Sequence, residues 1–323
     1  MVVRGLAVAA VAAAGAWLVT VQPIWPGEEA KESVTVSPDS LRRDVEQLAI
    51  TYGGRHHAHP GILSRAASYI EGRFRASGSR VEVDAYEVEG ATYRNVIARF
   101  GPAEGRPVVI GAHYDVEENT PGADDNASGV AGLLALADLF QKSPPGVPVE
   151  LVAYCLEEPP YFRSEHMGSR RHARALKAAG REPRLVVVLE MIGYFADAPG
   201  TQRYPLPGLS GIYPDQGNFI AVVGNYASIR EVRQVKAAMG QAGKVPVEAI
   251  VAPAILPGID FSDHASYWSE GMPAVMLTDT AFYRNPNYHR SGDLPDTLDY
   301  ARMARVVGAL AVLVEDVQVQ LPR

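Results

Sequence analysis

The stretch PVVIGAHYD, residues 107–115, is an almost unbroken apolar run that leads directly into His113 and Asp115. Two further runs repeat this plan: residues 149–155 precede Glu157 and Glu158, and residues 185–189 lead into Glu190. Short apolar runs bounded by polar residues are typical of strands buried on both faces of a sheet. The three runs therefore predict central strands of a mostly parallel sheet.

The segments around these runs extend the pattern. Residues 219–223 and 274–277 are also apolar, whereas residues 81–88 and 93–100 resemble a pair of half-buried strands. Helical periodicity is found at residues 41–48 and 62–76, from about Ser128, and over residues 296–319. Alternating strands and helices predict an α/β fold, here a three-layer domain over residues 38–323 with a mostly parallel central sheet covered by helices.

The N-terminus carries a different signal. Residues 5–21 contain no charged side chain and are mostly Ala, Val and Leu, with Arg4 just before them. Such a run is near the lower bound for a membrane-spanning helix and longer than a usual signal-peptide core. We therefore expect residues 1–22 to be a signal peptide or an N-terminal membrane anchor, and residues 23–37 to be a linker. The folded domain would be exported, either anchored outside the cytoplasm or secreted or periplasmic after cleavage.

Composition limits the class of protein. The 323 residues are 47% hydrophobic and 21% charged, as in ordinary globular chains. The formal net charge of −7 argues against a nucleic-acid partner, because such proteins usually present a basic face. Cys155 is the single cysteine, so a scaffold held by intrachain disulfides is excluded.

The polar residues that follow the predicted strands should lie close together. Ligand sites in open α/β sheets lie at the carboxyl ends of parallel strands, so His113, Glu158 and Glu190 are expected at one edge. Two loops carry further ligand types: GADDNASG at residues 122–129 contains Asp124 and Asp125, and NYHRS at residues 287–291 contains His289. A histidine with several carboxylates is the composition of a metal site.

The order of these motifs resembles the zinc aminopeptidase family, which also includes glutaminyl cyclase, glutamate carboxypeptidase and the inactive transferrin receptor ectodomain. The matching segments are His113-x-Asp115, the GADDNASG loop, Glu157-Glu158, EMIG at residues 190–193, SDHAS at residues 262–266 and Tyr288-His289. They cover nearly everything from about residue 40 onward. Each motif is weak alone, but their order and spacing together are specific.

The resemblance implies a role for each position. Asp125 is expected to bridge two zinc ions, with His113 and Glu190 completing one site and Glu158 and His289 the other. Glu157 is expected to be the general base, and Asp115 to orient His113. Residues 38–323 would then form a zinc peptidase catalytic domain with two zinc ions per chain. The implied reaction removes the N-terminal residue from a peptide with a free N-terminus, through a metal-bridging hydroxide.

Two further residues are candidates for supporting roles. Tyr288 matches a family position where a tyrosine stabilises the oxyanion, although a packing role is equally open. Asp263 is a candidate for supporting the site from a second layer. Glu190 stands where many family members have Asp, which bears on substrate preference more than on metal binding.

Other interpretations of the sequence stay open. Besides an aminopeptidase, the chain could be a single-zinc acyl transferase like glutaminyl cyclase, a carboxypeptidase, or a non-catalytic ectodomain. The carboxypeptidase alternative needs a cation for the terminal carboxylate, and only Arg163 and Arg290 stand very near the motifs. Ser128 is interpreted as a helix cap, and the histidines at positions 56, 57 and 59 as surface or packing residues.

Overall fold

The structure is a computed structural model that describes residues 14–23, 34–242 and 244–319. Within these ranges eight strands form one sheet, in the order β1-β2-β4-β3-β5-β8-β6-β7. The strands are β1 (Arg80–Val88), β2 (Ala91–Phe100), β3 (Val108–His113), β4 (Val149–Tyr154), β5 (Leu185–Glu190), β6 (Ile220–Gly224), β7 (Val247–Val251) and β8 (Val275–Thr278). β4, β3, β5 and β8 are mutually parallel, which confirms the predicted α/β fold with a mostly parallel sheet.

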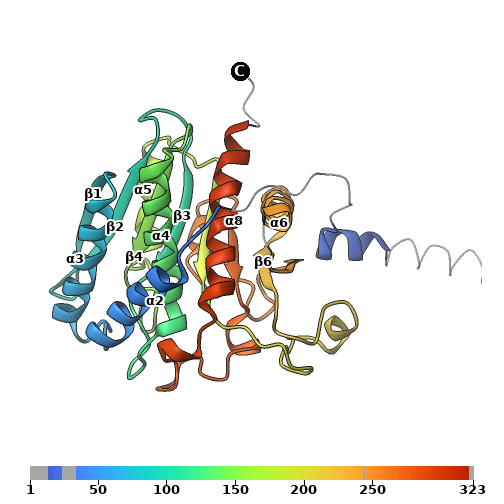
Figure 1. The fold of residues 1–323 in the computed structure, drawn as a ribbon. Helices are drawn as coiled ribbons and strands as arrows, with labels where there is room; N and C mark the ends of the chain where they lie inside the picture. The colour runs from blue at the N-terminus through green and yellow to red at the C-terminus, as the bar shows by residue number, and fades with distance from the viewer. Residues whose placement is uncertain (1–13, 24–33, 243, 320–323) are drawn as a thin grey trace, which may run out of the picture.

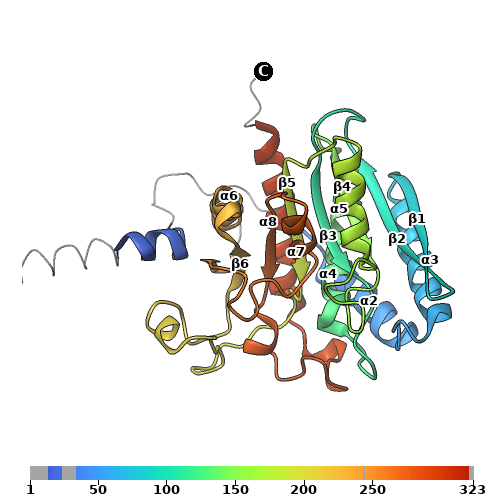
Figure 2. The same ribbon diagram turned by 180° about the vertical axis from the view of Figure 1, so that it is seen from behind.

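Helices cover both faces of the sheet (Figures 1 and 2). The α-helices of the domain are α2 (Pro38–Glu46), α3 (Pro60–Ala76), α4 (Gly129–Lys142), α5 (Gly168–Ala178), α6 (Ile229–Ala242), α7 (His264–Ser269) and α8 (Tyr300–Val319). α4, α6 and α8 pack on one face together with α2 and α3, whereas α5 and α7 pack on the other. These are the three layers that the alternation of strands and helices predicts.

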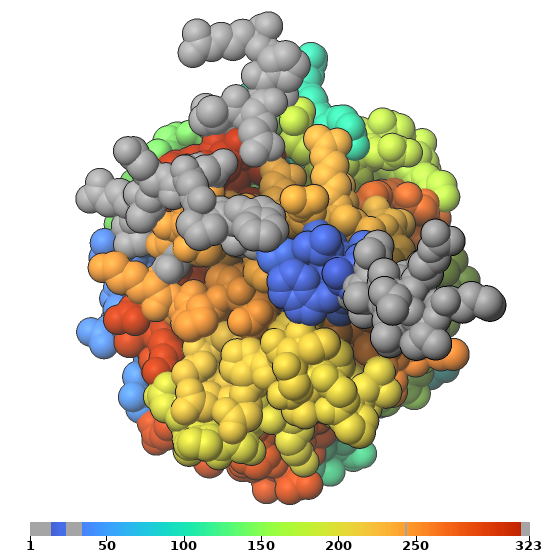
Figure 3. All heavy atoms as spheres, turned by 90° about the vertical axis from the view of Figure 1, so that its right-hand side faces the viewer, coloured from blue at the N-terminus to red at the C-terminus, as the bar shows by residue number. Residues whose placement is uncertain are grey.

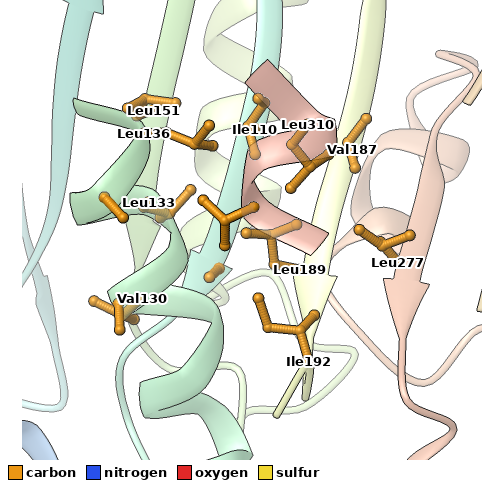
Figure 4. Close-up of a cluster of buried hydrophobic side chains, with 14 of the residues drawn as sticks. Ile110, Val130, Leu133, Leu136, Leu151, Val187, Leu189, Ile192, Leu277 and Leu310 are labelled. Atoms are coloured by element: carbon orange, nitrogen blue, oxygen red, sulfur yellow. The ribbon is translucent and has the colours of Figure 1, made fainter. Parts of the chain in front are cut away.

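The larger core lies between the sheet and the α4–α8 layer. Figure 4 shows Leu133 of α4 and Leu310 of α8 beside Ile110, Val187 and Leu189 of the central strands. All five side chains have no exposed surface. Burying one such side chain stabilises the fold by about 1.5–3 kcal/mol. This packing fixes the strands whose carboxyl ends carry the polar residues.

Several boundaries differ from the sequence-based expectation. β7 was not predicted, because it is a short edge strand and Glu248 interrupts its apolar run. α8 begins at Tyr300 instead of residue 296, since Pro295–Thr297 form a separate 3-10 turn and Leu298 is extended. The sequence predicts Asp39 or Ser40 as the cap of the first helix of the domain, but the cap of α2 is Ser37, whose side chain accepts from the backbone N–H of Ser40 at 3.3 Å.

The described part of the N-terminal segment lies on the surface beside α6. Residues 14–21 are helical, and Lys236 of α6 donates to the carbonyl oxygen of Val21 at 2.9 Å. Figure 3 shows residues 14–23, in blue, against the side of the molecule formed by the yellow and orange segments. The rest of the predicted anchor, residues 1–13, and most of the linker, residues 24–33, lie outside the described ranges. Of the helices that are described, none combines the length and hydrophobicity needed to cross a bilayer.

Candidate metal centre

Three strand ends bring the predicted residues to one edge of the sheet. β3 ends on His113 and β5 on Glu190, while β4 leads through Leu156 into Glu157 and Glu158. Leu156 has a left-handed conformation (φ 64°) that turns the chain at the end of β4. The four polar side chains are between 1% and 6% exposed, so an imidazole and three carboxyl groups share a buried space.

Asp125 lies between two histidines. Its Oδ1 is 3.3 Å from Nε2 of His113, and its Oδ2 is 3.1 Å from Nε2 of His289. Nε2 of His113 is also 3.3 Å from Oε2 of Glu190, and Nε2 of His289 is 3.3 Å from Oε2 of Glu158. The side chains thus form two sets of three potential metal ligands. One set is His113, Asp125 and Glu190, the other is Asp125, Glu158 and His289, and both share the carboxylate of Asp125.

Three groups of side chains are compact enough to hold a cation. His113, Asp125 and Glu190 offer ligand atoms that all lie within 4.8 Å of one another, and so do His113, Glu157 and Glu158. The third group adds Glu117 to Glu158 and His289. Glu117 was not predicted as a site residue, because it stands in a loop next to a second glutamate and belongs to none of the motifs.

The buried donor atoms of this cluster fit a zinc site. Within the described ranges, no hydrogen bond of acceptable geometry reaches Nε2 of His113, Oδ1 of Asp125 or Oε1 of Glu158, although all three atoms are inaccessible to solvent. An unsatisfied buried polar group costs about 1–3 kcal/mol, and more when it is charged. Imidazole nitrogen and carboxylate oxygen are ligands that zinc prefers in proteins. A bound cation would therefore satisfy atoms that the protein leaves unpaired.

The pKa values of the cluster reflect its crowded carboxyl groups. Burial would raise the pKa of Asp125, but His113 and His289 outweigh burial and lower that pKa. Burial and the charge of Asp125 raise the pKa of Glu158 to about 8. Burial also raises the pKa of Glu157 well above its usual range, against the opposing effect of His113. When no metal ion is bound, bound protons must neutralise part of the negative charge of these carboxylates. Metal binding releases such protons.

Neighbouring groups hold the ligands in place. Ser262 donates to Oε2 of Glu190 at 2.7 Å, and the backbone N–H of Glu158 donates to Oδ2 of Asp115 at 3.0 Å. Nδ1 of His113 is 3.1 Å from the carbonyl oxygen of Asp115 and 3.7 Å from its carboxylate. Asp115 thus contacts His113 chiefly through its main chain, while its carboxylate fixes the glutamate pair.

Asp293 fixes the loop that carries Asp125. Its two carboxylate oxygens accept from the backbone N–H groups of Asp124, at 2.9 Å, and Asp125, at 3.1 Å. The side chain is only 1% exposed, and burial raises its pKa to about 7. Asp293 was not predicted, because a single aspartate after the His289 motif gives no sign of what it binds.

Arg55 also supports this loop and was not predicted. Its guanidinium has no exposed surface and donates to the carbonyl oxygens of Leu48, Tyr114, Pro121 and Gly122 at 2.6–2.9 Å. Gly122 has φ 63°, and a Cβ there would lie 2.2 Å from Val116 and 2.3 Å from the carbonyl oxygen of Asp125. Only glycine therefore fits at this point of the loop.

The remaining predicted residues surround the cluster. The ring of Tyr288 stacks on His289, with centroids 3.9 Å apart and planes at 16°. Asp263 is fully buried, and burial raises its pKa to about 7 against the opposing effect of His113. Ser128 does not cap α4 through its side chain, which donates instead to the carbonyl oxygen of Asp124 at 2.7 Å. His56 and His57 pack together, with ring centroids 4.0 Å apart.

Sequence comparison identifies the family. The profile of Peptidase family M28 matches residues 95–314, which is most of the sheet and the whole cluster. The chain belongs to Peptidase family M28. This membership confirms the resemblance to a peptidase family that the motifs indicate.

Individual relatives of this M28 chain align with most of its length. The uncharacterized protein YfbL of Escherichia coli (strain K12) is 48% identical over 285 residues, covering 86% of this chain and 87% of YfbL. A protein named as a probable leucine aminopeptidase of Trichophyton verrucosum (strain HKI 0517) is 27% identical over 285 residues, covering 83% of this chain and 68% of that protein.

Solved structures share the M28 fold. The Legionella pneumophila LapA aminopeptidase superposes with a TM-score of 0.70 at 20% identity, over 89% of this chain and 73% of LapA. BSAP, a zinc aminopeptidase from Bacillus subtilis, gives 0.69 at 13% identity, over 89% and 96%. Bacteroides thetaiotaomicron glutaminyl cyclase gives 0.67 at 18% identity, over 88% and 99%.

Proposed function

We propose that this M28 peptidase is a zinc-dependent aminopeptidase that removes the N-terminal residue from peptides. The observation that carries the proposal is the position of Asp125, whose two oxygens face His113 at 3.3 Å and His289 at 3.1 Å. A carboxylate between two histidines, each of which also faces a glutamate, suits a pair of metal ions. The name of the Trichophyton verrucosum relative supports the aminopeptidase assignment.

The proposed ligands divide into two sets. His113, Asp125 and Glu190 would hold one zinc ion, and Asp125, Glu158 and His289 the other. When bound, the ions lower the pKa of a water molecule from about 15.7 towards 7 and polarise the substrate carbonyl group. The donor types and the unpaired buried atoms of His113, Asp125 and Glu158 support this division.

Glu157 is proposed to move the proton. Its carboxylate lies 3.9 Å from Nε2 of His113, beside the ligand cluster but in neither of the two proposed ligand sets. Burial raises the pKa of Glu157 and so makes its carboxylate a stronger base, which suits a group that accepts a proton from the attacking water and passes it to the leaving amine. Tyr288, stacked on His289, is proposed to donate to the oxyanion that develops on the substrate carbonyl.

Charge favours a free N-terminus over a free C-terminus. A substrate ammonium would meet several carboxylates at the cluster. Recognition of a terminal carboxylate would need a cation, best an arginine. Of the two arginines near the motifs, Arg163 is already paired with Asp260, at 2.5 Å, and Arg290 is exposed to solvent and does not line the cavity beside Glu190 and Tyr288. Arg55 is buried and donates to backbone carbonyl groups. Aminopeptidase action is therefore the better fit to these side chains.

The test compares an aminoacyl anilide with its N-acetyl form. Acetylation removes the ammonium charge, and a lost hydrogen bond to a charged group costs about 1.5–3 kcal/mol. We expect the acetylated substrate to be hydrolysed at least tenfold more slowly. Equal rates would contradict the aminopeptidase assignment. Cyclisation of an N-terminal glutamine without peptide hydrolysis would instead favour the glutaminyl cyclase alternative.

We further propose that the N-terminal segment takes the protein out of the cytoplasm. Residues 5–21 are uncharged, and Trp17, Leu18 and Val19 expose their side chains. Exposed apolar side chains on a helix suit a lipid surface. Cell fractionation of the full chain, tagged at the C-terminus, should find it in the membrane or the exported fraction. Recovery from the cytosol alone would contradict this proposal.

A further inference from the structure

A cavity opens beside the metal centre. It has a volume of about 800 Å³, counting the part that is open to solvent. Glu190 and Tyr288 stand at its metal end, so a substrate bound at the cluster would face directly into it. Much of its wall is apolar, formed by Phe219, Val223, Ile259, Phe261, Met276 and Phe282. The cavity is thus placed to receive the side chain of the substrate's N-terminal residue.

One row of the sheet lies along this cavity. Glu190 of β5 pairs with Thr278 of β8, Thr278 pairs with Ala221 of β6, and Ala221 pairs with Glu248 of β7. Paired residues on neighbouring strands project to the same face of a sheet. All four residues line the cavity. Glu248 therefore lies about 14 Å from Glu190 along the row, at three strand spacings of about 4.8 Å.

The residues between the two glutamates are small. Thr278 and Ala221 leave room above the sheet, and the next row, with Met276 and Val223, adds an apolar surface. The result is a trough with a carboxyl group at each end. A long unbranched side chain that starts at the metal centre would lie over Thr278 and Ala221 and point its end towards Glu248.

Most other polar groups of the cavity have partners within the protein. The Tyr213 hydroxyl donates to the carbonyl oxygen of Ala249 at 2.7 Å, and that of Tyr204 to Pro214 at 2.5 Å. Thr278 accepts from the backbone N–H of Thr280 at 2.9 Å. The amide of Gln202 pairs with Thr280 and Arg284, and Arg203 donates to the carbonyl oxygen of Phe282 at 2.8 Å. The hydroxyl groups of Tyr204 and Tyr213 and the amide of Gln202 are therefore poorly available to a ligand, whereas Arg203 is exposed to solvent.

Glu248 differs from them. In the part of the chain that the structure describes, its carboxyl group makes no hydrogen bond and no ion pair within 4.0 Å, and the side chain is half-buried. Burial raises its pKa, and Lys236 opposes that rise. Lys236 belongs to α6 on the other face of the sheet and donates to the carbonyl oxygen of Val21. The carboxyl group at the end of the trough is left to bind a ligand.

We propose that Glu248 selects substrates whose N-terminal residue has a long apolar stem and a cationic end, namely lysine or arginine. Lysine carries its ammonium on a flexible four-carbon stem, which matches an apolar trough that ends in a carboxylate. The aromatic rings of Phe219, Phe261 and Phe282 add faces that attract a cation. This inference rests on the proposed aminopeptidase function and adds a substrate class to it.

The experiment compares lysine and norleucine anilides. Norleucine has the same unbranched stem without the ammonium, so the ratio of the two kcat/KM values isolates the contact with Glu248. For the wild type we expect a higher kcat/KM on lysine than on norleucine. Glu248→Gln keeps the shape but removes the charge, and should lower the lysine-to-norleucine ratio at least tenfold, with the norleucine value rising.

A matched variant controls for loss of negative charge. Glu182 is exposed and lies just before β5, at the opposite end of the strand from Glu190. Glu182→Gln should leave kcat/KM for the lysine and norleucine anilides, and the ratio of the two values, unchanged. A wild-type preference for norleucine, or an unaltered ratio in Glu248→Gln, would overturn the inference while leaving aminopeptidase action intact. Failure of the wild type to hydrolyse any free aminoacyl anilide would instead overturn the proposed function.

Discussion

The two glutamates at the ends of one sheet row show how differently the metal centre and the cavity are built. Glu190 is 6% exposed, accepts from Ser262 at 2.7 Å and faces His113 at 3.3 Å. Glu248, on edge strand β7, is half-buried and makes no hydrogen bond with the described residues. The central strands thus hold groups rigidly for a reaction, whereas the edge strand offers a group to the substrate. The comparison separates residues whose substitution should slow the hydrolysis of every substrate from residues whose substitution should change the hydrolysis of some substrates only.

The largest effect is expected at Glu157. Glu157→Gln removes the proton carrier but keeps the size of the side chain, so turnover should fall by about two to four orders of magnitude. The loss should be the same for lysine, norleucine and leucine anilides, because the proton is moved in every case. Metal content should stay at the wild-type level in this variant.

Glu158→Gln is the matched control, because it changes the neighbouring residue in the same way. It should weaken metal binding instead, since Glu158 faces His289 at 3.3 Å in the proposed second zinc site. Steady-state kinetics and metal analysis of both variants check this prediction. If the two variants exchanged these properties, the assignments of base and ligand would be reversed.

A smaller effect is expected at Glu190, which belongs to both regions. Its carboxylate is a proposed ligand, and its side chain also lines the cavity. Glu190→Asp should retain metal and enlarge the metal end of the cavity by one methylene group, worth about 0.8 kcal/mol or roughly a fourfold shift in the preference between large and small N-terminal residues. Glu190→Ala should reduce the metal content. Unchanged metal content in Glu190→Ala would show that this residue is not a ligand.

The sequence predicts the metal centre better than the cavity, for a physical reason. His113, Glu158 and Glu190 directly follow or end apolar strands, so the parallel order of the strands is enough to bring them together. The cavity depends on loops around Gln202, Pro257 and Phe282, whose paths no local pattern determines. β7 was missed for a related reason, because the residue that distinguishes it, Glu248, interrupts its apolar pattern.

Supporting residues are the least predictable part of the site. Asp293 and Arg55 act by binding backbone groups of the Asp125 loop, and a backbone partner leaves no trace in the sequence. The same holds for Ser128, which was expected to cap a helix and instead donates to the carbonyl oxygen of Asp124. Side chains that bind metal can be identified from residue type and position, whereas side chains that bind the main chain require the structure.

The most direct test of the central claim is the zinc content of the purified chain, measured together with its activity on leucine anilide before and after chelation. We expect about two zinc ions per chain, loss of activity as they are removed, and recovery when zinc is returned. Full hydrolytic activity in metal-free protein would contradict the account.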